Sequence, residues 1–284
     1  MAVGLLLAAG GFAAGVFGAL LGLGGGILIV PLLTVGFDVP FRVAVGISLI
    51  CVLVTSSAAA GVYLERRVAN LRLGMLLELF TAMGALVGGL IAFALEERVL
   101  AGLFAVLLVY TAWSMTRRSR EPAAVPGLEL AAAAADGVDP AGPAGEVDPP
   151  GGFAATLSGD GYRVHRLPAG VAGSLAAGIV SALLGVGGGI VKVPLMHLVM
   201  GVPLRTATAT SNMMIGITAA ASATVYLLAG SIDPFVVGPT AAGVFVGALA
   251  GARVAPRVDL RLLRLVFVAV LLLTAVQMIA RAAG

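Results

Sequence analysis

The sequence has few of the residues that build disulfides, metal centres and soluble surfaces. It contains 1 cysteine, so an internal disulfide and a cysteine-based metal site are both excluded. Its 2 histidines, His165 and His197, lie too far apart in sequence to suggest a metal cluster, and we expect no cofactor. Charged residues make up only 11% of the chain, whereas a soluble domain is about one quarter charged. These shortages argue against an ordinary soluble protein.

Basic clusters that would bind nucleic acid are also missing. The pI near 9.5 comes from a few charges placed between apolar runs, and no stripe of Lys and Arg with interleaved aromatic residues exists. The first five residues contain no basic side chain, so we expect no cleaved signal peptide.

Long apolar runs dominate what remains. The chain is 60% hydrophobic, with a mean hydropathy of +1.10, and several runs exceed the roughly 18 residues that a membrane-spanning helix needs. These runs are too long, and too rich in Ala, Leu and Gly, for barrel strands. The sequence therefore predicts an all-α polytopic membrane protein, whose 40 glycines suit close helix packing.

The apolar runs fall into two sets of five predicted helices. The helices are expected at residues 3–21, 27–37, 43–64, 73–95, 99–116, 167–184, 190–200, 206–229, 234–254 and 261–281. Residues 27–37 and 190–200 are too short to cross a hydrocarbon core of about 30 Å alone.

Three regions follow from this pattern. We assign a first transmembrane repeat to 1–117, a linker to 118–166 and a second transmembrane repeat to 167–284. Within the linker, 121–162 is rich in Pro, Gly, Ala and acidic residues, which predicts a flexible segment. The alternative is a small soluble domain, but this composition cannot bury a core.

The two sets of helices are copies of one another. A constant offset of 163 residues aligns glycine, proline, arginine, serine and tyrosine positions, including Gly15/Gly178, Pro31/Pro194, Arg42/Arg205, Ser48/Ser211 and Tyr63/Tyr226. Composition alone would match only scattered Ala and Leu, so the pattern indicates an internal duplication.

The arginines indicate how the copies are oriented. Loop 65–72 has three arginines and its counterpart 228–235 has none, whereas 253–264 has four and its counterpart 96–98 has one. Because cytoplasmic loops concentrate Lys and Arg, equivalent loops should lie on opposite sides of the membrane. We therefore predict inverted repeats in the plasma membrane, with the linker cytoplasmic and both termini outside.

Each repeat contains a glycine cluster inside an apolar run, at residues 22–26 and 185–189. Glycine lets the backbone leave the helix, and a helix that restarts presents free N–H groups and a positive dipole end. Within a membrane this arrangement predicts discontinuous helices whose ends form an anion site. The alternative is a tight turn that serves helix packing. The candidate substrate-binding residues are Gly24, Gly25, Gly26, Gly187, Gly188 and Gly189.

Lys192 follows the second cluster, where the first repeat has Ile29. An ammonium among apolar residues is costly unless it is paired or faces a cavity, so we hypothesise that Lys192 supplies positive charge to an anion path. The alternative is that it reaches the membrane surface along its aliphatic stem.

Further polar residues lie in the helices that follow the short segments. They either bond neighbouring backbone or contact a ligand, and the candidate substrate-binding side chains are Ser48, Thr55, Thr210, Ser211 and Asn212.

Three charged residues have open roles. Arg42 and Arg205 start equivalent helices, where they either attract anions or anchor the helix at the interface. Glu78 lies within an apolar helix and is a candidate proton carrier, although an interfacial ion pair with Arg72 is slightly favoured.

The duplicated Gly-x-Gly-Gly-Gly-(x)4-Pro element, followed by Pro-x-Arg-x-Ala and a Ser/Thr-rich helix, resembles the TauE/SafE family of sulfite-exporter-like membrane proteins. The resemblance covers residues 3–116 and 167–281. It implies transport of a small sulfur-containing anion such as sulfite, thiosulfate or an organosulfonate, usually as export, across a prokaryotic plasma membrane.

The mechanism we expect is alternating access, with the two glycine breaks meeting near the midplane and the substrate held nearer the second. An anion channel with the breaks as a fixed filter is the alternative. An intramembrane enzyme is disfavoured, because the spans contain no constellation of His, Asp, Glu and Cys.

Overall fold

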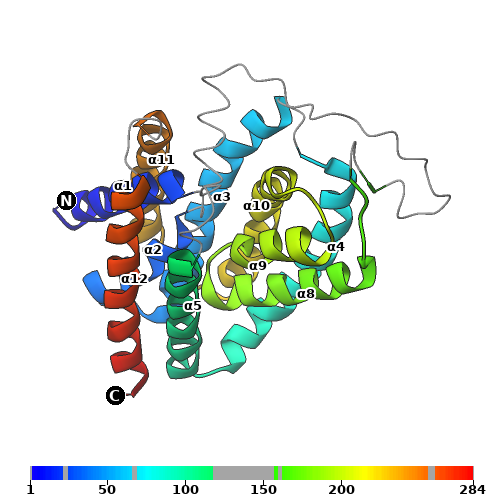
Figure 1. The fold of residues 1–284 in the computed structure, drawn as a ribbon. Helices are drawn as coiled ribbons and strands as arrows, with labels where there is room; N and C mark the ends of the chain where they lie inside the picture. The colour runs from blue at the N-terminus through cyan, green and yellow to red at the C-terminus, as the bar shows by residue number, and fades with distance from the viewer. Residues whose placement is uncertain are drawn as a thin grey trace.

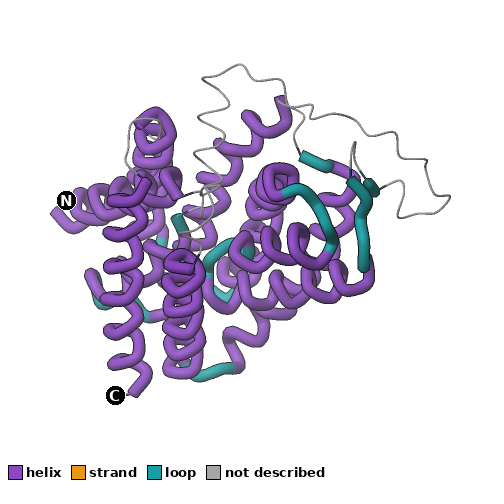
Figure 2. The backbone as a smooth tube through the Cα atoms, in the orientation of Figure 1, coloured by secondary structure: helices purple, strands orange, loops and turns teal. Residues whose placement is uncertain are grey.

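The computed structural model describes residues 2–21, 25–65, 69–117, 157–158, 162–254 and 260–283. Throughout these residues the secondary structure is helical, and no strand is present (Figure 2). The all-α prediction is confirmed.

The helices lie where hydropathy places them (Figure 1). The first half contains α1 (Ala2–Leu21), α2 (Gly26–Gly36), α3 (Phe41–Glu65), α4 (Leu71–Ala94) and α5 (Glu97–Arg117). The second half contains α8 (Leu167–Leu184), α9 (Gly189–Pro194), the π-helical turn η2 (Leu195–Val199), α10 (Leu204–Leu228), α11 (Pro234–Val254) and α12 (Leu260–Ala283). Each predicted segment is present, with α9 and η2 together filling 190–200, and no end differs by more than 2 residues. Most of the linker lies outside the described residues, so the three-region division stays a prediction.

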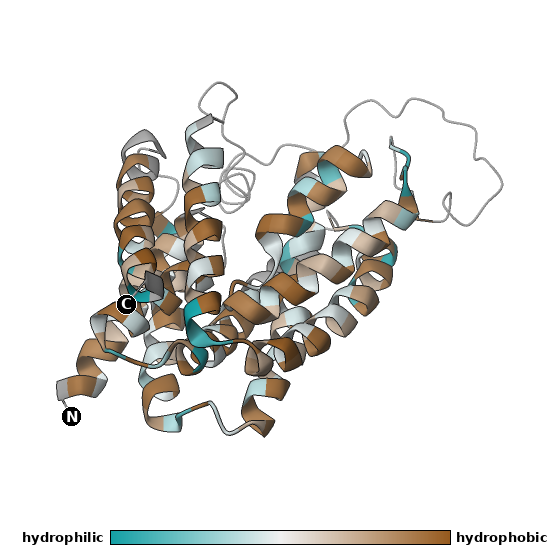
Figure 3. Cartoon of the chain, turned by 90° about the horizontal axis from the view of Figure 1, so that it is seen from below, coloured by the Kyte–Doolittle hydropathy of each residue, from teal (hydrophilic) through white to brown (hydrophobic). Residues whose placement is uncertain are grey.

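Six of the described helices are long and apolar enough to cross a membrane: α1, α4, α5, α8, α10 and α11. Their outward faces carry large apolar side chains, such as Leu5, Leu90 and Phe235, which are 75%, 66% and 87% exposed. Hydrophobic residues, coloured brown in Figure 3, recur along the helices. Because water would not tolerate so much exposed apolar surface, the chain is a multi-pass membrane protein.

The helices of the two halves pair reciprocally. α1 packs against α11 and α8 packs against α4, and the 163-residue offset converts one pair into the other. Counterparts also pair directly, α3 with α10 and α5 with α12, and the last pair lies side by side in Figure 1. This exchange is expected of halves related by a pseudo-two-fold axis.

Glycines hold the reciprocal helix pairs together at matching positions. A Cβ at Gly84 would lie 2.1 Å from the carbonyl oxygen of Leu175, and a Cβ at Gly247 would lie 2.1 Å from that of Phe12. These two contacts are the same contact shifted by the offset. Two further couples obey it: Gly88–Ile179 with Gly251–Val16, and Gly178–Thr81 with Gly15–Val244. The duplication is therefore visible in the packing, whereas the inverted orientation in a membrane stays a prediction.

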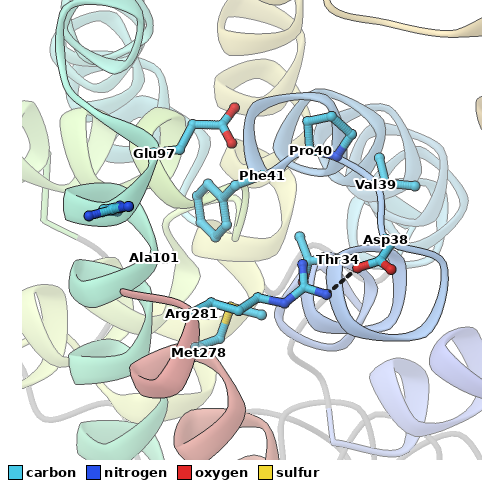
Figure 4. A pocket seen from close by; sticks show the side chains of 10 residues that line it. Thr34, Asp38, Val39, Pro40, Phe41, Glu97, Ala101, Met278 and Arg281 are labelled. Atoms are coloured by element: carbon cyan, nitrogen blue, oxygen red, sulfur yellow. Dashed lines mark hydrogen bonds and ion pairs between the residues drawn. The ribbon is translucent and has the colours of Figure 1, made fainter. Parts of the chain in front are cut away.

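Opposite ends of α4 gather different loops. Asn70, the N-cap residue just before α4, donates from Nδ2 to the Leu157 carbonyl (2.8 Å) and the Tyr162 hydroxyl (2.7 Å), joining loop 65–72 to the end of the linker. Beyond its last residue, Glu97 lines a cavity of about 420 Å³ with Asp38 and Arg281 (Figure 4). Loop 65–72 and the end of the linker, which are predicted to lie on one side of the membrane, thus lie at one end of the protein.

Candidate functional site

Both glycine clusters interrupt the helices, as predicted. Gly25 has φ 76° just before α2, and Gly188 has φ 78° just before α9. Gly185 and Gly187 also have positive φ values, 70° and 77°. These left-handed conformations suit glycine, because a side chain would be strained there. Of the predicted glycines, Gly24 lies outside the described residues.

The two breaks touch one another. A Cβ at Gly26 would lie 2.6 Å from the carbonyl oxygen of Gly185, so only glycine permits this approach. Ser48, fully buried on α3, donates from Oγ to Gly185 O (2.7 Å) and lies 3.2 Å from Gly26 O. Segments far apart in sequence are therefore tied at one point inside the protein.

The counterpart of Ser48 is not tied in this way. Ser211 on α10 is fully buried, yet its Oγ has no hydrogen-bond partner. It lies 3.8 Å from the position of a Cβ on Gly189, which begins α9. Ser181 on α8 also has a buried, unpartnered hydroxyl, and it lies beside Gly188. Unsatisfied buried hydroxyls are costly, so the second break holds polar atoms that a ligand could satisfy.

A closed triangle of polar side chains stands next to the second break. Lys192 Nζ on α9 lies 2.9 Å from Glu78 Oε2 on α4, and it donates to Thr218 Oγ1 on α10 at 2.6 Å. Thr218 in turn donates to Glu78 Oε1 at 2.7 Å. Lys192 is 1% exposed and Glu78 is 4% exposed. We call Lys192, Glu78 and Thr218 the triad.

The triad answers two questions that the sequence left open. Lys192 is buried within the protein, so the alternative in which it reaches the membrane surface is wrong. The Glu78 carboxylate is buried and bonds Lys192 and Thr218 from the other half, so the favoured interfacial ion pair with Arg72 is wrong. A Cβ at Gly188 would lie 3.5 Å from Lys192 Cε, which places the triad against the break.

Two candidate threonines bond the backbone, one of the alternatives left open. Thr210 Oγ1 accepts the N–H of Asn70 at 2.9 Å, which fixes the start of α4 against α10. Thr55, the counterpart of Thr218, donates to the carbonyls of Cys51 and Val52 within its own helix.

The remaining candidates are Arg42, Asn212 and Arg205. Arg42 donates to the Leu95 carbonyl, and its guanidinium lies 5.9 Å from the centre of the Phe93 ring, which suits an anchor at the start of α3. Asn212 is half-buried on α10, beside Ser211. The side chain of Arg205 lies outside the described residues.

Comparison with known proteins gives one family and one distant relative. The model of the family described as Sulfite exporter TauE/SafE matches residues 7–278. A probable membrane transporter protein, YunE of Bacillus subtilis (strain 168), is 23% identical over 280 residues, which cover 95% of this chain and 94% of that protein. No solved structure matches the chain.

Proposed function

Because the chain belongs to the TauE/SafE family of membrane transporters, we propose that it carries a small sulfur-containing anion across the plasma membrane by alternating access. The substrates we favour are sulfite, thiosulfate and organosulfonates, and the direction we favour is export. The family description names sulfite and export.

The observation that carries this proposal is the meeting of two broken helices beside buried polar groups. In α2 the first helical hydrogen bond is made by the N–H of Leu28 to Gly25, and in α9 by the N–H of Val191 to Gly188. The N–H groups before these bonds face the breaks with the positive dipole ends of their helices. The unpartnered Ser211 hydroxyl and the Lys192 ammonium add donors at the second break. This set of donors suits an oxyanion better than a cation.

Substrate identity is tested by flux into liposomes that contain the purified protein, with sulfite, sulfate, thiosulfate, taurine and sulfoacetate offered in turn. We expect saturable, slow flux of at least one of them. If no sulfur oxyanion is carried, the substrate assignment is wrong. Fast flux that does not saturate would show a channel with the breaks as a fixed filter.

The site is tested by Ser48→Ala, because this hydroxyl ties the two breaks. We expect flux of the preferred anion to fall by roughly tenfold, as when one hydrogen bond is lost. Ser57→Ala is the matched control, since Ser57 lies on the same helix but is exposed and donates only to Leu53 within it. Equal effects of both substitutions on flux would show that the two breaks are not part of the transport path.

A further inference from the structure

The triad contains a fully buried ion pair. It differs sharply from the ion pair between Arg281 and Asp38: the side chains of Lys192 and Glu78 are 1% and 5% exposed, whereas those of Arg281 and Asp38 are 40% and 89% exposed. A buried ion pair is weak evidence for stability, because desolvation offsets most of the attraction. Its position, joining α9 at the second break to α4, calls for another explanation.

The ammonium that an anion would need is already occupied. Lys192 donates to both Glu78 and Thr218, so an arriving anion must compete with the Glu78 carboxylate for the same positive charge. Two anions sharing one buried cation leave a net negative charge in a low-dielectric interior. Neutralising Glu78 removes that obstacle.

We propose that a proton bound to Glu78 frees Lys192 for the substrate, so that the transporter carries one proton together with each monovalent anion. This inference rests on the proposed function and adds a second transported species to it. In a cell with an alkaline interior, export then requires the outward anion gradient to exceed the inward proton gradient. The ion pair is neutral when the site is empty, and the site is again neutral when a proton and a monovalent anion are both bound. A site holding only one of the two would carry a buried net charge, which the membrane interior disfavours.

Thr218 provides the hydrogen bonds for both states. In the structure its hydroxyl donates to Glu78 Oε1, and the Met214 carbonyl, 3.2 Å away, is a second acceptor. When a proton bonds to a Glu78 oxygen, the new O–H donates to Thr218 Oγ1 while the Thr218 hydrogen turns to Met214. The protonated acid thus keeps a partner while Lys192 is released.

Other ionisable groups on the neighbouring elements are engaged elsewhere or stand at helix ends. α8 has none, and α10 carries Arg205 in its first turn and Tyr226, whose hydroxyl donates to the Ala182 carbonyl. His197 on η2 lies 2.9 Å from the Val202 carbonyl, and Arg72 is in the first turn of α4. Glu78 is the carboxylate that bonds Lys192 directly, so we assign the transported proton to Glu78.

The stoichiometry follows from the unequal breaks. At the 163-residue offset, Lys192 corresponds to Ile29 and Glu78 corresponds to Ala241, so the first break has no ion pair equivalent to the one at the second break. Only Thr55 matches, as the counterpart of Thr218. One acid and one base, paired at the second break only, give one proton for each anion.

The test measures anion accumulation in liposomes with the membrane potential clamped at zero and a pH gradient imposed. The probe is isethionate, a sulfonate whose single charge is constant over the assay range, or methanesulfonate, which has the same property, if isethionate is not carried. We expect about tenfold accumulation for each pH unit, on the alkaline side, because one proton drives one anion. With the pH equal on both sides, an imposed potential should drive no accumulation.

Variants separate the proton step from binding. Glu78→Gln should lose the pH-driven accumulation while counterflow of labelled against unlabelled anion remains measurable. Thr218→Val, which keeps both charges, should weaken the response if Glu78→Gln does not fold. Asp38→Asn breaks the exposed ion pair and is the matched control, with accumulation equal to that of the unmodified protein.

Two outcomes overturn different proposals. Saturable flux that follows the membrane potential and ignores the pH gradient would overturn proton coupling and leave anion transport intact. If no sulfur anion moves under any gradient, both the transport assignment and the coupling are wrong.

Discussion

At the residue scale, Lys192 is a charge that the surrounding sequence does not explain. It is the single lysine of the chain and lies among Ile, Val and Pro, so a partner or a cavity was expected. The partner, Glu78, is 114 residues away on α4. A usable signal existed, because an isolated base and an isolated acid inside apolar helices are expected to pair. The sequence could not show which helix faces turn toward one another.

The triad predicts unequal effects on stability. Lys192→Met alone leaves a buried carboxylate without its cation and should destabilise the protein by about 3–5 kcal/mol. The double variant Lys192→Met with Glu78→Gln removes both charges and should lose much less. Thermal unfolding of the solubilised protein measures both, and equal losses would show that the ion pair is not electrostatically coupled.

The two equivalent serines predict a separation of stability from binding. Ser48 has carbonyl partners, whereas Ser211 has none. Ser48→Ala should therefore lower the unfolding temperature. Ser211→Ala removes an unsatisfied hydroxyl, which should raise the free energy of unfolding by about 1 kcal/mol or leave it unchanged while weakening anion binding. A loss of stability without a loss of binding would mean that Ser211 serves packing only.

At the element scale, the helices could be predicted and their packing could not. Every helix follows an apolar run, and membrane helices must satisfy their backbone internally, so hydropathy alone placed their ends. Small residues determine which helices pack together, because they let two backbones approach closely. The 40 glycines mark too many possible packing faces to choose among. The touching of the breaks was expected, whereas the contacts of Ser48 that tie them required the structure.

The glycine contacts predict position-dependent effects along α11. A Cβ at Gly247 would lie 2.1 Å from the Phe12 carbonyl, so Gly247→Ala must push α1 away and should lower the unfolding temperature. A Cβ at Gly238 on the same helix meets nothing within 4 Å. Gly238→Ala should gain up to about 1 kcal/mol of helix propensity. Gly84→Ala, related to Gly247 by the repeat, should reproduce the loss, and a tolerated Gly84→Ala would contradict the shared packing.

At the scale of the whole molecule, the two ends of the protein predict sidedness. Glu97 and Arg281 line one cavity, whereas Ser158 lies with loop 65–72 at the other end of α4. In a Cys51→Ala background, Glu97→Cys and Arg281→Cys should react with an impermeant maleimide added to intact cells. Ser158→Cys should react only after permeabilisation. Labelling of Glu97→Cys and Arg281→Cys from different sides would contradict the fold, and labelling of both only from inside would reverse the charge-based orientation.

The unequal distribution of the triad has a consequence for the transport cycle. If the halves are inverted, a carrier made from two identical halves would face either side with equal ease. Here the ion pair stands at the second break only, because the equivalent positions at the first break are Ile29 and Ala241, so the inward-facing and outward-facing forms differ in energy. The transporter would then be kinetically asymmetric, with a different half-saturating anion concentration on each face of the membrane.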